Sequence, residues 1–205
     1  MPKIVDHEAR RAEIVFALWL VIAEHGIEGV SLRHVAAAAG VSMGRIQHYF
    51  GTKDALVLAG CTALIDTAYD DYLEKTADAD PRARLLHVVS QQIPQDDAGR
   101  IGVSVWYAYV AKSINHTAVR QVLAEARRGA EDECARLVRA VRGGGDVAHG
   151  GDATGGGATD GSDDAALELA RRLLALADGL TLRVLVGDLE PAEALATLGA
   201  DVDRV

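Results

Sequence analysis

The segment SLRHVAAAAGVSMGRIQHYFGTK, residues 31–53, is typical of two short helices joined by a tight turn. Ser31 is suited to cap the first helix, and the apolar positions that follow recur at the spacing of one helical face: Leu32, Val35, Ala36 and Ala39. Gly40 accepts the left-handed backbone that ends a helix, and Ser42 is suited to cap the next one. Because helices joined so closely cross steeply, we expect the second helix to face outward.

The second helix separates its residue types by face. Val41, Ile46 and Phe50 are apolar and would pack inward. Arg and Gln side chains bond pairs of atoms on guanine and adenine edges, so Arg45 and Gln47 are candidate base-reading residues. We expect DNA contacts from the outward positions and the helix starts: Ser31, Arg33, Ser42, Met43, Gly44, Arg45, Gln47, His48, Tyr49, Thr52 and Lys53.

This segment, extended to MGRIQHYFGTKDAL, resembles the DNA-binding region of TetR-type transcriptional regulators. The matching positions are Ser31, Val35-Ala36, Ala39-Gly40-Val41-Ser42, Phe50, Lys53 and Leu56. Many family members carry a tyrosine where this chain has Gln47. The resemblance implies a dimeric helix-turn-helix protein that binds operator DNA and commonly releases it when a small molecule binds its helical body. The alternative is that these are two ordinary core helices.

Composition favours an all-α protein, since 49% of the 205 residues are hydrophobic and only 4% are aromatic. We expect a three-helix helix-turn-helix domain at residues 1–53 and a helical effector-binding and dimerisation domain at residues 54–205. The net charge of −9 is unevenly distributed. Residues 1–53 hold six Lys/Arg against five acidic residues, and the remainder holds fifteen against twenty-five. A locally positive end on an acidic body is compatible with DNA binding.

Helical periodicity predicts further helices at about 6–25, 52–73, 81–93, 99–114, 117–142, 163–185 and 191–198, with Thr52 and Asp80 as caps. Arg10 and Arg11, near the start of the first of these, are either DNA-backbone contacts or solvated surface charge. Residues 143–161 contain nine glycines and predict a flexible loop. Calcium-binding repeats or a metal site at His149 would need several repeats in register, so we predict no metal site there.

The helix after the loop is apolar on more sides than a monomer's core needs, which predicts that it also packs on a second subunit. The predicted dimer interface comprises Leu169, Leu173, Leu176 and Leu180. The stretch from Asp178 to Leu195 resembles the C-terminal domain of the choline-responsive betaine-operon repressor subgroup. The TetR resemblance implies pairing through the last two helices into a four-helix bundle.

Aromatic residues recur at helical spacing in the body: Tyr69 and Tyr72 on one helix, and Trp106, Tyr107 and Tyr109 on another. They form either plain core or the wall of a pocket for an unidentified effector, hydrophobic or cationic. If they line a pocket, these five residues are the expected effector contacts.

No motif in the chain supports catalysis. There is no phosphate-binding loop, dinucleotide fingerprint or His-Glu-x-x-His, so we expect neither an enzyme nor a cofactor. Cys61 and Cys134 lie far apart and outside any metal-ligand cluster, which favours a reduced compartment. No apolar run approaches the roughly 20 residues that span a bilayer, so we expect a cytoplasmic protein without a membrane partner.

We therefore expect a homodimeric, ligand-responsive repressor that binds a palindromic operator in double-stranded DNA. Two alternatives stay open at this point. One is a helical small-molecule binding protein or enzyme whose helix-turn-helix no longer binds DNA. The other is a transcriptional activator of the same fold, which sequence alone does not distinguish from a repressor.

Overall fold

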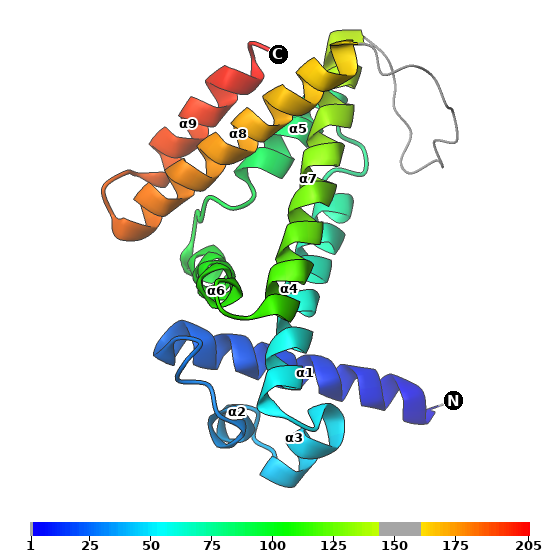
Figure 1. The fold of residues 1–205 in the computed structure, drawn as a ribbon, viewed down its shortest axis with the longest axis vertical. Coiled ribbons are helices and arrows are strands. Elements are labelled where there is room, and N and C mark those ends of the chain that lie inside the picture. Colours follow the sequence, from blue (N-terminus) through cyan, green and yellow to red (C-terminus); the bar gives the residue numbers. More distant parts are fainter. Residues whose placement is uncertain (1, 144–160) are drawn as a thin grey trace. The chain divides into compact units, whose positions relative to one another are not determined.

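A computed structural model describes residues 2–143 and 161–205 (Figure 1). Within these residues the chain is helical and has no strand. The helices are α1 (Pro2–His25), α2 (Leu32–Ala38), α3 (Met43–Phe50), α4 (Lys53–Lys75), α5 (Pro81–Ser90), α6 (Asp97–Ser113), α7 (Thr117–Gly143), α8 (Gly161–Val186) and α9 (Pro191–Val202). This confirms the predicted all-α class. The glycine-rich loop predicted at 143–161 lies, apart from its two end residues, outside the described residues.

The chain divides into two compact units. The first unit comprises Met1–Ala68 and Arg100–Ala124, so it contains α1 to α3, most of α4, nearly all of α6 and the start of α7. The second unit comprises Tyr69–Gly99 and Glu125–Val205, and so contains α5, α8 and α9 with the remaining parts of α4 and α7. Helix α6 therefore belongs with the helix-turn-helix rather than with α8 and α9.

Helix starts follow the predicted capping residues. Each predicted cap accepts a hydrogen bond from the backbone N–H three positions further on, at 2.8–3.2 Å; these caps are Ser31, Ser42, Thr52 and Asp80. Such a bond satisfies one of the N–H groups that the first turn of a helix leaves without a partner. The same residues fix where α2, α3, α4 and α5 begin.

The turn between α2 and α3 depends on Gly40. Its φ of +62° lies in the left-handed region, where a side chain is strained. The N–H of Gly40 donates to the carbonyl of Ala37 at 3.2 Å, and the N–H of Val41 donates to that of Ala36 at 3.0 Å. These two bonds are those of a Schellman ending. They stop α2 and turn the chain directly into the Ser42 cap of α3.

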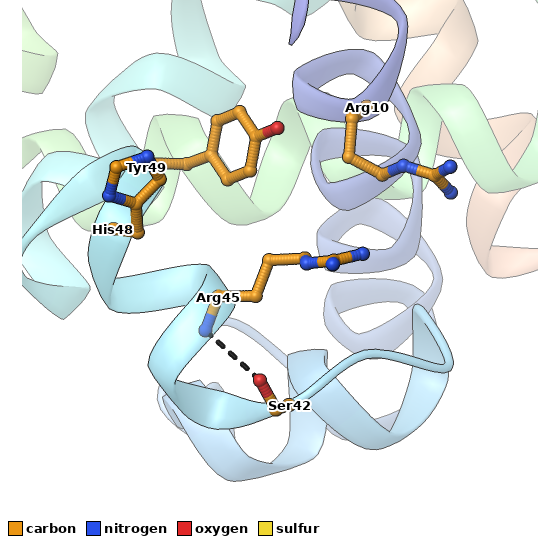
Figure 2. Close-up of a pocket in the computed structure, with 5 residues that line it drawn as sticks. All are labelled: Arg10, Ser42, Arg45, His48 and Tyr49. Carbon is orange, nitrogen blue, oxygen red and sulfur yellow. Dashed lines mark hydrogen bonds between the residues drawn. The ribbon is translucent and has the colours of Figure 1, made fainter. Parts of the chain in front are cut away.

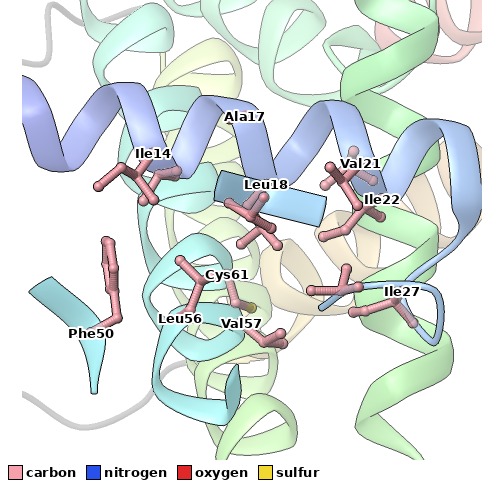
Figure 3. Packing of buried hydrophobic residues seen from close by; sticks show 14 of the residues in the cluster. Ile14, Ala17, Leu18, Val21, Ile22, Ile27, Phe50, Leu56, Val57 and Cys61 are labelled. Atoms are coloured by element: carbon pink, nitrogen blue, oxygen red, sulfur yellow. The ribbon is translucent and has the colours of Figure 1, made fainter. Parts of the chain in front are cut away.

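The first unit is built on the crossing of α1 and α4 (Figure 3). Fully or almost fully buried apolar side chains from both helices, joined by those of α2 and α3, form one core: Ile14, Leu18, Ile22, Val35, Ile46, Phe50, Leu56, Val57 and Cys61. At Gly60 of α4 the indole N–H of Trp19 donates to the backbone carbonyl at 3.1 Å. This core holds α2 and α3 against α1 and leaves the outer face of α3 in solvent.

The second unit has its own core, in which α5, α8 and α9 pack on one another. Helices α8 and α9 lie side by side (Figure 1). Helix α7 is joined to α8 by the ion pairs Arg127–Asp178 and Arg171–Glu131, the latter at 2.9 Å. Burial raises the pKa of Asp178, although the charge of Arg127 opposes that shift. Three predicted boundaries were wrong: α1 begins at Pro2 rather than near residue 6, α5 ends at Ser90 rather than near residue 93, and α9 continues to Val202 rather than ending near residue 198.

Candidate nucleic-acid interface

Helix α3 presents the outward face that its residue pattern predicts. Ile46 and Phe50 are buried and Val41 is half-buried, so the apolar side faces the core. The residues on the outer side are exposed: Ser42, Met43, Gly44, Arg45, Gln47 and His48. A Cβ placed on Gly44 would have no heavy atom within 4 Å. The outer face of α3 is therefore open enough for another surface to approach its backbone.

A hollow of about 590 Å³ lies between α3 and α1, both in the first unit (Figure 2). It is lined by Arg10 from α1 and by Ser42, Arg45, His48 and Tyr49 from the start and body of α3. The side chain of Arg45 extends from α3 toward α1. Each of the five lining side chains carries a hydrogen-bonding N–H, ring nitrogen or hydroxyl, and none is acidic. Such a lining suits an anionic group.

The rings at this hollow are fixed by packing. Tyr49 is half-buried, and its ring centroid lies 4.5 Å from that of His7 in α1 and 5.6 Å from that of His48. These contacts tie the far end of α3 to the first turns of α1. The sequence motif did not reveal them, because His7 lies outside it and 42 positions earlier in the chain.

The two arginines near the start of α1 have different environments. Arg10 lines the hollow, and its Nη1 lies 2.5 Å from Oε2 of Glu13. The guanidinium carbon of Arg11 lies 4.7 Å from the ring centroid of Phe50, in the geometry of a cation–π contact. Sequence reasoning left both as either DNA contacts or surface charge. Only Arg10 shares a surface with the outer face of α3.

The remaining predicted DNA-binding residues flank the helix-turn-helix. Arg33 and Thr52 are exposed, whereas Ser31 and Lys53 are half-buried. The hydroxyls of Ser31 and Thr52 accept backbone N–H groups as caps, and each retains its own O–H donor. The predicted contacts beside α3 therefore lie at three helix starts, those of α2, α3 and α4.

Glu28, an exposed acidic residue near Lys53, pairs with a different lysine. Oε1 of Glu28 lies 2.9 Å from Nζ of Lys112, a residue of α6. The hydrogen bond and charge of Lys112 lower the pKa of Glu28, with a smaller contribution from Lys53. Lys112 thus draws this carboxylate, and Lys53 forms no ion pair among the described residues.

The five aromatic residues proposed for the effector do not fall in one unit. Tyr69 and Tyr72 belong to the second unit, whereas Trp106, Tyr107 and Tyr109 belong to the first. Tyr109 is fully buried, burial raises its pKa, and its hydroxyl has no hydrogen-bond partner within the described part of the chain. Tyr72 is also buried, while Tyr69 is 58% exposed. At least Tyr72 and Tyr109 are thus core residues of their units.

The second unit contains a partly buried polar cluster that the sequence analysis missed. The Tyr72 hydroxyl donates to Oε1 of Glu133 and accepts a bond from Nη2 of Arg84 at 3.2 Å. Arg136 makes two further bonds to Glu133, at 2.6 and 2.7 Å. Burial alone would raise the pKa of Glu133, but the bonds from Arg136 and Tyr72 outweigh it and lower that pKa. The available signal was Arg84, which stands among the inward positions Leu85, Val88 and Val89 of α5.

The four leucines predicted for a dimer interface are already buried, fully or in part, within their own subunit. Leu173 and Leu180 are buried in the core of the second unit, and Leu169 and Leu176 are half-buried against it. The exposed stripe of α8 runs beside them and contains Glu168, Arg172, Ala175, Gly179, Leu182 and Val186. Leu182 is 50% and Val186 69% exposed. These two are the largest apolar side chains that α8 leaves in solvent.

Over residues 2–143 and 161–205 no group of three or more His, Cys, Asp and Glu side chains is placed to hold a metal ion. None of the helices in the same residues has the length and apolar character needed to cross a membrane.

Comparisons with known proteins agree on one family. The family model described as "Bacterial regulatory proteins, tetR family" matches residues 16–59. The model described as "BetI-type transcriptional repressor, C-terminal" matches residues 81–205, more than half of the chain. The names indicate transcriptional regulators rather than enzymes, in agreement with the sequence analysis.

Among curated relatives, the HTH-type transcriptional regulator PksA of Bacillus subtilis (strain 168) is 38% identical over 113 residues. That alignment covers 54% of this chain and only 55% of PksA, so the chain spans about half the length of this relative. The HTH-type transcriptional regulator BetI of Paraburkholderia xenovorans (strain LB400) is 29% identical over 208 residues, covering 100% of this chain and 96% of BetI.

Among solved structures, a transcriptional regulator from Saccharomonospora viridis in complex with choline matches with a TM-score of 0.72. The match covers 96% of this chain and 94% of that one at 24% identity. At this identity the likeness concerns the fold alone.

Proposed function

Because the chain belongs to the TetR family of bacterial transcriptional regulators and has a BetI-type C-terminal domain, we propose that it is a ligand-responsive repressor that binds a palindromic operator as a dimer. The observation that carries the proposal is the exposed outer face of α3, which borders a hollow lined by non-acidic hydrogen-bonding side chains. A recognition helix needs this combination of an apolar inner side and a polar, accessible outer side.

Sequence is read by Arg45 and Gln47. Both are exposed on α3. Arginine bonds two acceptors of guanine, and glutamine bonds an acceptor and a donor of adenine, each pair contributing about 1–3 kcal/mol of discrimination. Gly44, with open space where a Cβ would stand, lets the backbone of α3 come close to the base edges. Met43 and His48 border this reading surface.

Phosphates are held by the helix starts around the motif. The hydroxyls of Ser31, Ser42 and Thr52, together with Arg33 and Lys53, give donors that flank α3 on both sides in sequence. Contacts of this kind set orientation and affinity but carry no sequence information. Their loss therefore weakens binding to all duplexes alike, in contrast to the loss of Arg45 or Gln47.

Dimerisation uses the exposed stripe of α8 together with α9. Ala175 and Gly179 allow close approach of a second helix, and Leu182 and Val186 supply apolar area that a monomer leaves in water. Leu173 and Leu180 support this surface from inside, whereas Leu169 and Leu176 stand at its margin. Two recognition helices about 34 Å apart, or a multiple of that, would match successive major-groove faces.

The effector is a small molecule, hydrophobic or cationic, and choline is the first compound to test. Support comes from the relatives named BetI and from the choline complex of the Saccharomonospora viridis regulator. Coupling of about 1–3 kcal/mol between effector and operator sites would weaken operator binding roughly 5- to 150-fold. Titration calorimetry with choline chloride, and the same titration in the presence of operator DNA, measures both the affinity and this coupling.

Mobility shifts on operator and scrambled duplexes test the DNA-reading assignment. Arg45→Ala and Gln47→Ala should each lose preference for the operator, whereas Lys53→Ala should weaken both duplexes equally. Circular dichroism controls for folding, since all three side chains lie outside the buried core. Unchanged preference in both α3 variants would contradict the proposal.

A further inference from the structure

We propose that the hollow between α1 and α3 is a phosphate site, filled in the DNA complex by one backbone phosphate held mainly by Arg10, and that Glu13 competes with this phosphate for the same guanidinium. The inference rests on the proposed function and adds α1 to the DNA-contacting elements. It also assigns different roles to Arg10 and Arg11, which the sequence leaves equivalent.

The lining of the hollow matches a phosphate in charge and in donors. Arg45 extends its guanidinium toward α1, Ser42 and Tyr49 bring hydroxyls, and Arg10 lines the hollow from α1 while its guanidinium pairs with Glu13 (Figure 2). The guanidinium of Arg45 has no hydrogen bond or ion pair within the described part of the chain, so it stays available to read a base while Arg10 binds the phosphate. Guanidinium forks bind phosphate oxygens in pairs, which gives both charge and direction. No carboxylate lines the hollow to oppose an anion.

The position of the hollow beside α3 indicates that its occupant is a backbone phosphate of the DNA that α3 binds. Arg45 lies both on the outer face of α3 and on the wall of the hollow, so DNA held against α3 runs beside the opening. Arg10 reaches the same space from α1. A backbone phosphate next to the base pairs under Arg45 is therefore the anion at highest local concentration once α3 is docked.

Glu13 holds Arg10 when DNA is absent. Arg10 and Glu13 lie about one helical turn apart on α1, and their side chains meet at 2.5 Å. The Arg10 side chain is 38% exposed and that of Glu13 is 54% exposed. Exposed pairs of this kind are weak, because water and salt screen them. A phosphate can draw Arg10 away, but the protein must give up the Glu13 contact. Glu13 therefore lowers DNA affinity through Arg10.

Arg11 is the matched control. It neighbours Arg10 in the chain and carries the same charge, but its guanidinium stacks on Phe50 rather than lining the hollow. Arg10→Gln and Arg11→Gln change the charge of the first unit equally. Any general electrostatic effect on DNA binding is thus common to both variants, and only a specific contact separates them.

The test is fluorescence anisotropy of labelled operator and scrambled duplexes across KCl concentration. Arg10→Gln should weaken both duplexes and lower the slope of log affinity against log salt by about 1, since one phosphate contact is lost. The advantage of wild type over Arg10→Gln should then shrink roughly three- to fourfold between about 50 and 200 mM KCl. Arg11→Gln should keep the wild-type slope. Equal slopes for wild type and Arg10→Gln would overturn the inference.

A double-mutant cycle tests the role of Glu13. Glu13→Gln should tighten binding in the wild-type background and have no effect in the Arg10→Gln background, because its action passes through Arg10. Tightening of equal size in both backgrounds would show that Glu13 merely repels DNA and would refute the competition. Thermal melts of all four proteins confirm that each is folded.

Two outcomes distinguish failure of the proposed function from failure of the phosphate site. If wild type shows no preference for any operator, the proposed function fails. If it keeps its preference while Arg10→Gln behaves like Arg11→Gln, the phosphate site alone fails.

Discussion

Gly60 of α4 and Tyr109 of α6 meet so closely that a Cβ on the glycine would lie 2.6 Å from the tyrosine hydroxyl oxygen. The same Cβ would lie 2.5 Å from Cδ2 of Leu18 on α1. Since all three residues are buried, three helices of the first unit approach one another at a position that accepts only glycine.

Gly60→Ala is therefore expected to destabilise the first unit by about 1–3 kcal/mol, because overpacking displaces Leu18 or Tyr109. Urea unfolding followed by circular dichroism measures this. Gly102→Ala on α6 is the matched control, as its Cβ meets nothing within 4 Å and alanine favours a helix by up to about 1 kcal/mol. Equal stability of the two variants would contradict the close packing.

Gly44→Ala should separate stability from DNA binding. The new methyl group has open space in the free protein, so the melting temperature should hold or rise. In the complex the same methyl group would stand between α3 and the base edges, so operator affinity should fall. Anisotropy titrations and thermal melts on one preparation check both expectations. An unchanged operator affinity would mean that α3 does not approach DNA through Gly44.

The Tyr72–Glu133 cluster predicts a pH dependence. Glu133→Gln should cost about 1–3 kcal/mol at pH 7, because Arg136 and Arg84 lose a charged partner. The pKa of Glu133 is lowered in the folded protein, so its contribution is fully present above the ordinary value of 4.5 and is lost as the pH falls through the lower folded-state pKa. Urea midpoints of wild type and variant should converge below about pH 4.5.

A constant difference between these urea midpoints down to acid pH would contradict the assignment. Tyr72→Phe serves as a companion variant. It removes one hydrogen bond to Glu133 without removing the charge, so its cost should be smaller and should depend less on pH.

Leu182→Glu combined with Val186→Glu should give folded monomers. Both residues are exposed in the single subunit, so a charge there costs little until a second subunit covers them. Leu173→Glu, at a residue only 3% exposed, should instead unfold the second unit. Sedimentation velocity with circular dichroism distinguishes the two results. A folded dimer of the double variant would exclude the α8 stripe from the interface.

Local sequence signals predicted most of the fold. The caps Ser31, Ser42, Thr52 and Asp80 act through bonds to residues three positions away, so their effect is visible in the sequence itself. The inward face of α3 follows from helical spacing in the same way. Long-range contacts were not accessible: nothing near Gly60 in sequence indicates Tyr109, and nothing near Tyr49 indicates His7.

For the candidate sites too, local features could be predicted from the sequence and long-range contacts could not. The outer face of α3 could be predicted because one short segment contains it. The separation of Arg10 from Arg11 depends on which side of α1 faces α3, and the division of the five aromatic residues between two units depends on how α4 and α6 pack. Leu173 was expected at the dimer interface, but apolar spacing does not tell which side of a doubly apolar helix packs within its own subunit.

Footprinting of the purified protein on the DNA that flanks its own gene measures whether paired α3 helices bind an operator. Two protected tracts related by a dyad are expected, with centres one helical turn or a multiple apart, and both should be lost in Arg45→Ala. Absence of any protected tract, or two tracts that persist unchanged in Arg45→Ala and Gln47→Ala, would contradict this expectation.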